Sequence, residues 1–492
     1  MDELAFAPFS QPPRNSPAHR LALWLLFGLF AVSVLLAIVT HTTYDSGDSI
    51  THYFFARYAF RYPVHFLDLW AKPVVTTLMA LPAQFGFTGV KLFQCVAVAA
   101  SAWLSYLTAR RLRVGWAAAA IFFCYASPDY FRIQFSGLTE PTFGLLLIAG
   151  VYLAVADRPL WSAAVISLLP FARSEGSLML GIWAVYLGQQ RQWRALPLLF
   201  LGYLVFSVVG GVVFDDFAWV FHKNPYSLHS QYGSGKWSNY LVSIPPLLGW
   251  VLSALVLVGT GRMLYRLTQQ REWRQPGFAA EVLLIGGSLV GFVTLQSVFW
   301  AFGLFGSFGL TRVMTVLAPL FAIVALWGFN WLRELGASPT ARLRIGWGLL
   351  AAVAVFPFLG TRNGFRWQRD FELAGEQRLG HRVLDWLAWQ PTGKAHPIAV
   401  ELPYFAFLAD LDWFDEAKRP PVTKDGHPTL DALPAGTYVL WDSWFFPTEA
   451  HIPLDKLKND GRFQTRWEGE EYLDTNRPDR GTWRAVIFEK VK

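Results

Sequence analysis

Long apolar runs recur along the first 360 residues, and the first of them limits what the chain can become. Residues 21–40 form a run of twenty residues without a charge. A helix of that length spans about 30 Å, the thickness of the hydrocarbon core of a bilayer. No small-residue cleavage site closes the run, so we interpret it as an uncleaved signal anchor. The sequence therefore predicts a membrane protein.

Ten further apolar runs are candidate membrane spans. They cover 88–109, 114–127, 138–156, 160–172, 176–188, 195–213, 241–261, 279–302, 313–331 and 345–360. Two of them, on either side of 170–176, are short enough to form one helix with Arg173 and Glu175 inside it. We expect an all-α polytopic membrane domain over residues 1–360, with about eleven transmembrane helices, the N-terminus inside and the C-terminus outside.

The distribution of arginine and lysine favours two separate short helices. With eleven spans, the inner segments hold 15 cations and the outer segments hold 8. Cytoplasmic loops carry the excess of positive charge in membrane proteins. Fusing the two short pieces would place nine of the inner arginines outside. We therefore expect a hairpin with residues 173–176 (RSEG) at its tip, recessed below the outer surface because both helices are short.

Composition excludes several classes of protein. Only 16% of the residues are charged and 53% are hydrophobic, with a mean hydropathy of +0.31. These values exclude a disordered or fibrous chain and argue against a wholly soluble enzyme. The net charge of +7 does not indicate a nucleic-acid partner, because residues 1–360 carry +10 and residues 361–492 carry −3. The positive excess lies in the apolar part, where it orients loops across a membrane.

The segment 41–87 joins the first two spans. It begins with residues 44–48 (YDSGD), continues with an aromatic helical stretch over 49–61, and reaches Lys72 before an apolar stretch over 73–87 that is too short to span. Such aromatic, amphipathic segments are typical of helices that lie in the membrane interface. Asp48 is a candidate cap for the first of these helices.

Residues 361–492 are polar and form a separate domain. We expect an amphipathic helix over 370–389, strands over 397–402, 437–442 and 482–489, and a helix start at 453–455. Strands that alternate with helices indicate a small soluble α/β domain. By the topology above, this domain lies outside the membrane.

Ionisable residues gather in the segments expected on the outer side. Of the 14 acidic residues in 1–360, eight lie there. Because acidic residues contribute little to membrane topology, chemistry at the outer face is one explanation. The candidate site residues are Asp45, Asp48, Lys72, Asp129, Glu140, Arg173 and Glu175.

Each candidate also has a plain structural interpretation. Asp48 could only cap a helix, and Lys72 could reach the lipid headgroups as an ordinary snorkelling lysine. Glu140 could stabilise a helix N-terminus through the helix dipole. Arg173 and Glu175 could neutralise each other, although a charged pair below the bilayer surface is costly and favours a function.

Metal and cofactor sites are not predicted. The ten histidines show no HxH or HxxxH spacing, and the two cysteines lie in apolar runs. Paired acidic residues could still hold a divalent ion through their oxygens. The sequence contains neither a Walker A motif nor a dinucleotide-binding glycine pattern.

Four short motifs occur in a fixed order: an Asp-initiated first outer loop, KP at 72–73, TEP at 139–141 and RSEG at 173–176. In this order and sidedness the chain resembles membrane glycosyltransferases of the GT-C fold, which take sugar from a polyprenyl- or dolichyl-phosphate carrier. Relatives include protein O-mannosyltransferases and the lipid A aminoarabinose transferase. The segment 311–319 is similar to the Arg…Pro helix of that group, and the resemblance covers about residues 1–335.

The resemblance implies roles for the acidic residues. Asp48 would be the general base, with Asp45 as its rival for that role and His52 in support. Asp129 or Glu140 would orient the acceptor. An acceptor hydroxyl would attack the anomeric carbon of the carrier-bound sugar directly, which inverts its configuration.

The resemblance also implies a donor site and partners. Lys72 and Arg173 would hold the carrier phosphate, with Arg312 as a third cation and Glu175 in support. The partners would be a polyprenyl-phosphate-linked sugar, such as mannose or another hexose or pentose, a glycan, lipid or protein acceptor, and membrane lipids. We expect a multi-pass protein of a bacterial plasma membrane, with its site and C-terminal domain on the outer side.

A transporter or flippase is the main alternative of another class. Transporters usually carry ionisable groups or broken helices near the bilayer midplane, and often internal repeats. Here most charges fall at the ends of the expected spans, and no repeat is visible. The sequence therefore favours the enzyme.

Overall fold

The structure, a computed structural model, describes residues 16–275, 277–360, 364–390, 396–424, 427–474 and 478–492. The chain divides into two compact units. The first, the helical unit, comprises Tyr62–Phe365 and the residues up to Val39. The second, the sheet unit, comprises Thr40–Arg61 and Arg366–Lys492.

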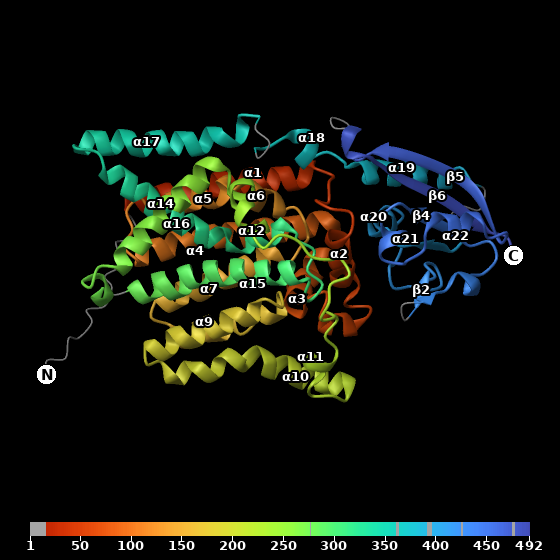
Figure 1. The fold of residues 1–492 in the computed structure, drawn as a ribbon, viewed down its shortest axis with the longest axis horizontal. Helices are drawn as coiled ribbons and strands as arrows, with labels where there is room; N and C mark the ends of the chain where they lie inside the picture. Colours follow the sequence, from red (N-terminus) through yellow and green to blue (C-terminus); the bar gives the residue numbers. More distant parts are fainter. Residues whose placement is uncertain (1–15, 276, 361–363, 391–395, 425–426, 475–477) are drawn as a thin grey trace. The chain divides into compact units, whose positions relative to one another are not determined.

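The described part of the helical unit consists of helices joined by turns and loops. Its long helices run roughly parallel, with α9 and α10 along one edge and α17 along the other (Figure 1). The helices are α1 (Pro17–Val39), α3 (Pro73–Ala83), α4 (Gly86–Arg111), α5 (Ala119–Ala126), α6 (Pro128–Ile133), α7 (Glu140–Val155), α8 (Pro159–Ile166), α9 (Gly176–Gln189), α10 (Leu201–Phe214), α11 (Trp219–His222), α12 (Asn239–Val242), α13 (Ile244–Leu248), α14 (Trp250–Leu267), α15 (Ser288–Phe302), α16 (Ala318–Glu334) and α17 (Pro339–Val355).

Among the described residues, seven helical stretches are long and apolar enough to cross a membrane. Three shorter apolar stretches accompany them, at Pro73–Ala83, Glu140–Val155 and Pro159–Phe171. The expected polytopic α-helical membrane domain is thereby confirmed. The seven stretches are Pro17–Val39, Gly86–Arg111, Trp193–Phe214, Trp250–Leu267, Ala280–Phe302, Thr311–Glu334 and Pro339–Phe358.

Two expected spans differ from the helices observed. The run 114–127 contains only the eight residues of α5, about 12 Å of helix, because Pro128 begins a new helix. The run 241–261 is interrupted at Gly249, whose φ of +80° ends one short helix before α14 begins at Trp250. Hydropathy alone does not register such breaks, since the residues around them stay apolar.

The two short pieces around residue 170 form a hairpin, as the charge distribution predicted. Helix α8 ends at Ile166, a 3₁₀ turn covers Leu169–Phe171, and α9 begins at Gly176. A Cβ at Gly176 would lie 2.3 Å from the carbonyl carbon of Leu169, so only glycine allows the turn to close. Residues 173–176 therefore lie at a helix–helix tip.

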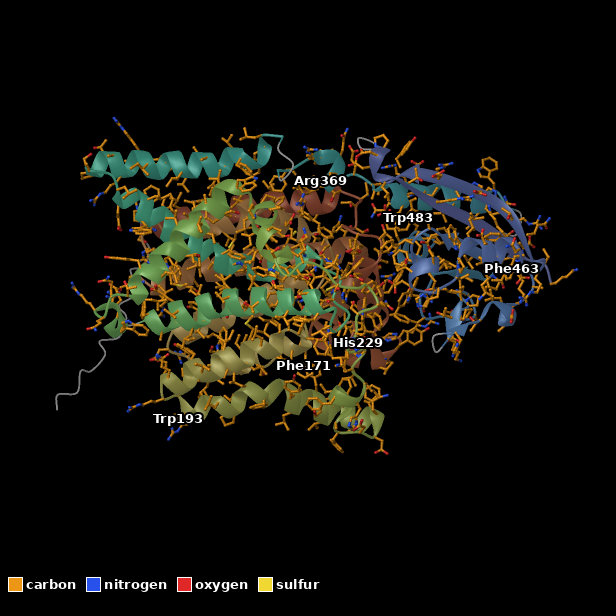
Figure 2. All side chains as sticks on the ribbon, in the orientation of Figure 1. Phe171, Trp193, His229, Arg369, Phe463 and Trp483 are labelled. Atoms are coloured by element: carbon orange, nitrogen blue, oxygen red, sulfur yellow. The ribbon has the colours of Figure 1, made fainter. Side chains whose placement is uncertain are left out.

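The two ends of the helical unit carry different segments. Figure 2 places Phe171, next to the hairpin tip, toward the same end as His229, and it places Trp193 at the opposite end. Elsewhere in the unit, the Asn330 side chain donates to the Gly115 carbonyl at 2.8 Å, and it thereby ties the turn after α4 to the end of α16.

The sheet unit contains a four-stranded sheet in the order β1-β4-β6-β5, and a separate two-stranded pair, β2-β3. Strands β1 and β4 are parallel, and the other neighbours in the large sheet are antiparallel. Its elements are α2 (Asp48–Tyr58), α18 (Trp367–Asp370), α19 (Gly375–Ala388), α20 (Pro403–Leu408), α21 (Phe445–Thr448), α22 (Leu454–Lys458), β1 (Ile398–Val400), β2 (Thr423–Lys424), β3 (His427–Pro428), β4 (Tyr438–Asp442), β5 (Phe463–Tyr472) and β6 (Thr482–Lys490).

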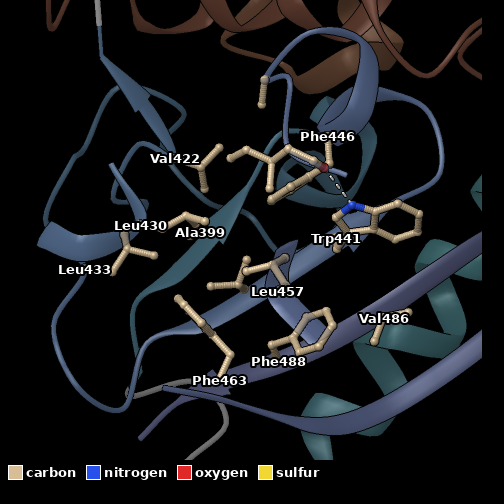
Figure 3. Close-up of a cluster of buried hydrophobic side chains, with 13 residues drawn as sticks. Ala399, Val422, Leu430, Leu433, Trp441, Phe446, Leu457, Phe463, Val486 and Phe488 are labelled. Carbon is tan, nitrogen blue, oxygen red and sulfur yellow. Dashed lines mark hydrogen bonds between the residues drawn. The ribbon is translucent and has the colours of Figure 1, made fainter. Parts of the chain in front are cut away.

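Alternation along the central strands builds the core of the sheet unit. Val439 and Trp441 of β4 join Phe488 of β6 in a buried apolar cluster, in which the Trp441 indole donates to the Ile452 carbonyl at 3.0 Å (Figure 3). Tyr438 points to the other face of the sheet, where its ring contacts Trp386 of α19. The expected strands 397–402, 437–442 and 482–489 and the helix start at 453–455 are confirmed, and β5 was missed because this edge strand is largely exposed and polar.

The aromatic segment 49–61 packs within the sheet unit, although we had assigned it to the membrane domain. Phe54 stacks on Trp413 at 5.6 Å between ring centroids, and Phe55 meets Phe414 edge-on at 5.0 Å. Arg61 forms an ion pair with Asp412 at 2.6 Å. The division of the chain therefore differs from the predicted boundary at residue 360, because these aromatic side chains find their partners among residues 407–414.

Candidate active site

Lys72 lies at the start of α3 in an uncommon backbone conformation. Its φ and ψ are +70° and 101°, a region that residues other than glycine rarely adopt. The Asp68 carboxylate holds this turn by accepting the backbone N–H groups of Trp70 and Ala71 at 2.9 and 2.7 Å. The backbone is therefore constrained at the residue that carries a buried cation.

The Lys72 ammonium is enclosed by two partners from elsewhere in the chain. Its Nζ donates to Ser174 Oγ at 2.9 Å and lies 4.7 Å from the centre of the Tyr226 ring. The residue is only 6% exposed. Burial lowers the pKa of Lys72 to about 7, against the opposing effect of the nearby Glu175 carboxylate. An anion bound here would favour the charged form of this lysine.

Arg173, at the hairpin tip, connects the start of α7 with the start of α9. Its guanidinium donates to Thr139 Oγ1 at 2.8 Å and to Glu140 Oε1 at 3.0 Å. A second nitrogen donates to Glu175 Oε1 at 3.0 Å. Ionic contacts therefore join two motifs that are distant in the sequence, TEP and RSEG.

Two further segments complete this cluster. Arg312 Nε lies 3.9 Å from Glu140 Oε1, and Gln296 of α15 donates to Glu175 Oε1 at 2.6 Å. Tyr240 of α12 is buried beside the cluster, where burial and the Glu175 charge raise its pKa to about 12. We call Lys72, Glu140, Arg173, Glu175 and Arg312 the ionic cluster; its three cations and two carboxylates carry a formal charge of +1.

Glu140 Oε2 and Arg173 Nε are buried, and neither atom has a hydrogen-bond partner within the described part of the chain. A buried acceptor or donor without a partner costs about 1–3 kcal/mol. Both atoms are therefore suited to bind a polar ligand.

The loop 223–238 brings Tyr226 to Lys72, because it docks on the glycine-rich turn 303–309. The backbone N–H of Ser230 donates to the Gly303 carbonyl at 2.8 Å, and that of Gly235 to the Trp300 carbonyl at 3.1 Å. Tyr232 packs on Phe308 with 4.4 Å between ring centroids. The turn 303–309 therefore provides a packing surface for this loop.

The second-loop candidates differ in their surroundings. Asp129 is paired with Arg132 on the same turn of α6. Glu140 instead shares the Arg173 guanidinium and keeps one carboxylate oxygen unpaired. The geometry therefore favours Glu140 over Asp129 as the residue that meets a ligand.

The first-loop candidates belong to the sheet unit. The expected cap at Asp48 is wrong: Asp48 is the first residue of α2, and Asp45 caps the helix by accepting the N–H groups of Gly47 and Ser49 at 3.1 and 2.9 Å. The local reason is that the Gly47 backbone lets the chain turn between the two aspartates. His52 is buried on α2, one turn beyond Asp48.

Three side chains that contact the ionic cluster were not named as site residues from the sequence. They are Ser174, which lies within the RSEG motif, and Gln296 and Tyr226, whose proximity to Glu175 and Lys72 depends on tertiary folding. Asp68 could have been recognised from the sequence, because it is an acidic residue four positions before Lys72. Within the described ranges, no group of three or more His, Cys, Asp or Glu side chains gathers in a way that would hold a metal ion.

No protein-family model matches the chain, and no curated protein matches its sequence. Solved structures do match its fold. ArnT from Cupriavidus metallidurans bound to undecaprenyl phosphate matches with a TM-score of 0.60 at 14% identity, over 95% of this chain and 97% of that chain. The apo state of the same ArnT matches with a TM-score of 0.53 at 16% identity, over 95% and 98%.

The Archaeoglobus fulgidus oligosaccharyltransferase is a more distant match, with a TM-score of 0.47 at 11% identity over 85% of this chain and 69% of that chain. The agreement with ArnT extends over nearly the whole length of both chains, and so includes the membrane helices and the C-terminal sheet. The chain therefore has the GT-C fold, as its ordered motifs predicted.

Proposed function

We propose that this protein is an inverting membrane glycosyltransferase that moves a sugar from a polyprenyl-phosphate carrier to an acceptor hydroxyl. The observation that carries the proposal is the ionic cluster: three cations from distant segments meet at the end of a helical membrane unit. The likeness to ArnT, which was solved with undecaprenyl phosphate, supports it.

The ionic cluster suits the phosphate of a lipid carrier. The cluster carries a buried formal charge of +1. A phosphate that enters it would lose its water and accept hydrogen bonds from cationic side chains that are already held in place. Arg312 reaches the cluster from a third segment, where its Nε lies 3.9 Å from Glu140 Oε1. The long apolar helices of the same unit provide the medium that a prenyl tail needs.

Glu140 is suited to orient the acceptor. Its Oε1 is bound by Arg173, and its buried Oε2 lacks a donor within the described part of the chain. A polar group of the acceptor other than the reacting hydroxyl, such as a neighbouring hydroxyl, that donates to Oε2 would satisfy this atom and hold the acceptor in one orientation.

Asp48 is the residue that we propose as the general base. Asp45 Oδ1 is already engaged by two backbone N–H groups, which makes Asp45 the structural member of the pair. In the proposed step, Asp48 takes the proton of the acceptor hydroxyl, and the oxygen bonds to the anomeric carbon. The bond from that carbon to the carrier oxygen breaks, and the phosphate leaves with the electron pair.

The departing phosphate gains negative charge in this step. Lys72, Arg173 and Arg312 are held in place before the reaction, so they stabilise that charge without reorganising. One displacement inverts the anomeric carbon. We propose that the reaction takes place at the outer face of a bacterial plasma membrane, because the ionic cluster lies in segments that the arginine distribution assigns to that side.

Mass spectrometry of the lipids that copurify with the protein tests the proposal, followed by transfer from the identified donor to a glycan, lipid or protein acceptor. We expect a polyprenyl-phosphate-linked sugar, and a product whose new bond has the inverted anomeric configuration. Movement of a lipid-linked sugar across proteoliposomes without any transfer would instead establish the transporter alternative and overturn the proposal.

A further inference from the structure

The acidic loop before α2 is held in place by side chains of α19. Ser46 Oγ donates to Glu376 Oε1 at 3.0 Å, and the Ser46 carbonyl accepts the backbone N–H of Tyr404 at 3.1 Å. Gln377 Nε2 donates to Thr43 Oγ1 at 2.9 Å. These partners are more than 320 residues apart in sequence, yet all belong to the sheet unit.

A continuous chain of hydrogen bonds leads from Gln377 to the helix that carries Asp48. Gln377 Oε1 accepts the N–H of Ala374 at 3.1 Å, which fixes its amide, and its Nε2 donates to Thr43. Thr43 Oγ1 in turn donates to the backbone carbonyl of Asp45 at 2.7 Å. Asp45 then caps α2 through Gly47 and Ser49.

Glu376 contacts the same loop through Ser46. Burial raises the pKa of Glu376, and the nearby Asp45 carboxylate adds to this rise, while the Ser46 hydroxyl and Arg378 oppose it. Tyr404 also lies close enough to feel the Glu376 charge. A neutral side chain at position 376 could accept the Ser46 hydrogen bond without placing a second carboxylate near Asp45. We therefore infer that the Glu376 carboxylate has a role beyond packing.

We propose that Glu376 and Gln377 are positioning residues of the transfer reaction, which act through Ser46 and Thr43 to fix the Asp45 turn and the first turn of α2. This inference rests on the proposed function of Asp48. It makes the C-terminal domain part of the catalytic machinery, because the base would be placed by side chains that follow the last membrane helix. The Phe445 ring also packs against this loop, since one of its carbons lies 3.0 Å from an ideal Cβ at Gly47.

Hydrogen exchange tests the tether without reference to catalysis. In the full-length protein, Glu376→Ala and Ser46→Ala should each speed amide exchange at Gly47 and Ser49 about fivefold, because a hydrogen bond that restrains the loop is lost. Glu372→Gln, a change at an exposed carboxylate just before α19, is the matched control and should leave these amides unchanged. Unchanged exchange in Glu376→Ala would overturn the tether itself.

Steady-state kinetics tests the positioning role. We expect Glu376→Ala to lower kcat about tenfold with an unchanged donor KM, since the base is displaced and the donor site is not. Glu376→Gln keeps the oxygen that accepts from Ser46 and should retain most of kcat. The double variant Ser46→Ala/Glu376→Ala should be no slower than either single variant.

Effects on kcat that multiply in the double variant would contradict the proposal, because two residues that act through one bond cannot contribute independently. So would a Glu376→Ala variant with fast loop exchange and full kcat. If the wild-type protein transfers no sugar while the exchange results hold, the proposed function fails and the tether remains.

Discussion

The guanidinium of Arg173 lies 3.0 Å from a carboxylate oxygen of Glu140, and this ion pair joins the hairpin tip to the start of α7. Both side chains are largely buried, at 15% and 2% exposure. Burying such a pair is costly, because each charge must lose its water. The two segments must therefore be held together by the fold. The Arg173–Glu140 ion pair is therefore the centre of the site, and the other charged residues of the ionic cluster lie around it.

Arg173→Gln should destabilise the helical unit. The change leaves the carboxylates of Glu140 and Glu175 buried without their shared cation, and breaking such a pair typically costs about 3–5 kcal/mol. The midpoint of thermal unfolding in detergent should fall clearly. Arg194→Gln, at an exposed arginine after α9, is the matched control. Equal midpoints for the two variants would mean that the pair contributes nothing to the fold.

Much of this architecture could be predicted because it depends on local pattern. Apolar run length identified the helices, and the excess of arginine in the inner segments separated α8 from α9. Short apolar runs identified β4 and β6, whose central residues are buried. Each of these signals is carried by residues that are neighbours in the chain.

The features that escaped prediction depend on distant partners. The aromatic face of α2 has the composition of an interfacial helix, and only the presence of Trp413 and Phe414 shows where it packs. Tyr226 reaches Lys72 because its loop docks on residues 303–309, which no local pattern reveals. The capping role of Asp45 rather than Asp48 depends on how the chain turns at Gly47.

Asp48→Asn should reduce kcat by about 10²–10⁴, the usual contribution of a general base, while the donor KM stays unchanged. Asp45→Asn is the matched variant, since asparagine retains an oxygen that can cap α2. Asp45→Asn should keep at least a tenth of kcat, because the expected loss is on the order of one electrostatic contact. If Asp45→Asn loses more activity than Asp48→Asn, the roles of the two aspartates are exchanged.

Donor affinity should depend on pH through Lys72. Burial lowers the pKa of this lysine to about 7, so it is charged below pH 7 and increasingly neutral above it. The phosphodiester of a sugar-loaded carrier does not titrate in this range, so affinity should be highest near pH 6 and should fall as the pH rises toward 9. Lys72→Met should bind weakly at every pH, and equilibrium binding titrations should show the wild type approaching it at pH 9. A wild-type affinity that is constant from pH 6 to pH 9 would exclude this role for Lys72.

Tyr226→Ala should raise the donor KM about twofold to thirtyfold. The ring lies over the Lys72 ammonium, and a cation–π contact of this kind contributes about 0.5–2 kcal/mol. Tyr226→Phe retains the ring and should behave as the wild type in the same steady-state assay. A loss in Tyr226→Phe as large as in Tyr226→Ala would show that the hydroxyl, and not the ring, is the active part.

The account depends most on the claim that the ionic cluster binds a lipid phosphate. Equilibrium binding of undecaprenyl phosphate to the purified full-length protein measures this directly. Arg312→Gln should weaken binding about 10- to 100-fold, the value of one charge-assisted hydrogen bond, because the variant loses one cation of the ionic cluster. Arg194→Gln should bind as tightly as the wild type, and equal affinity for all three proteins would contradict the account.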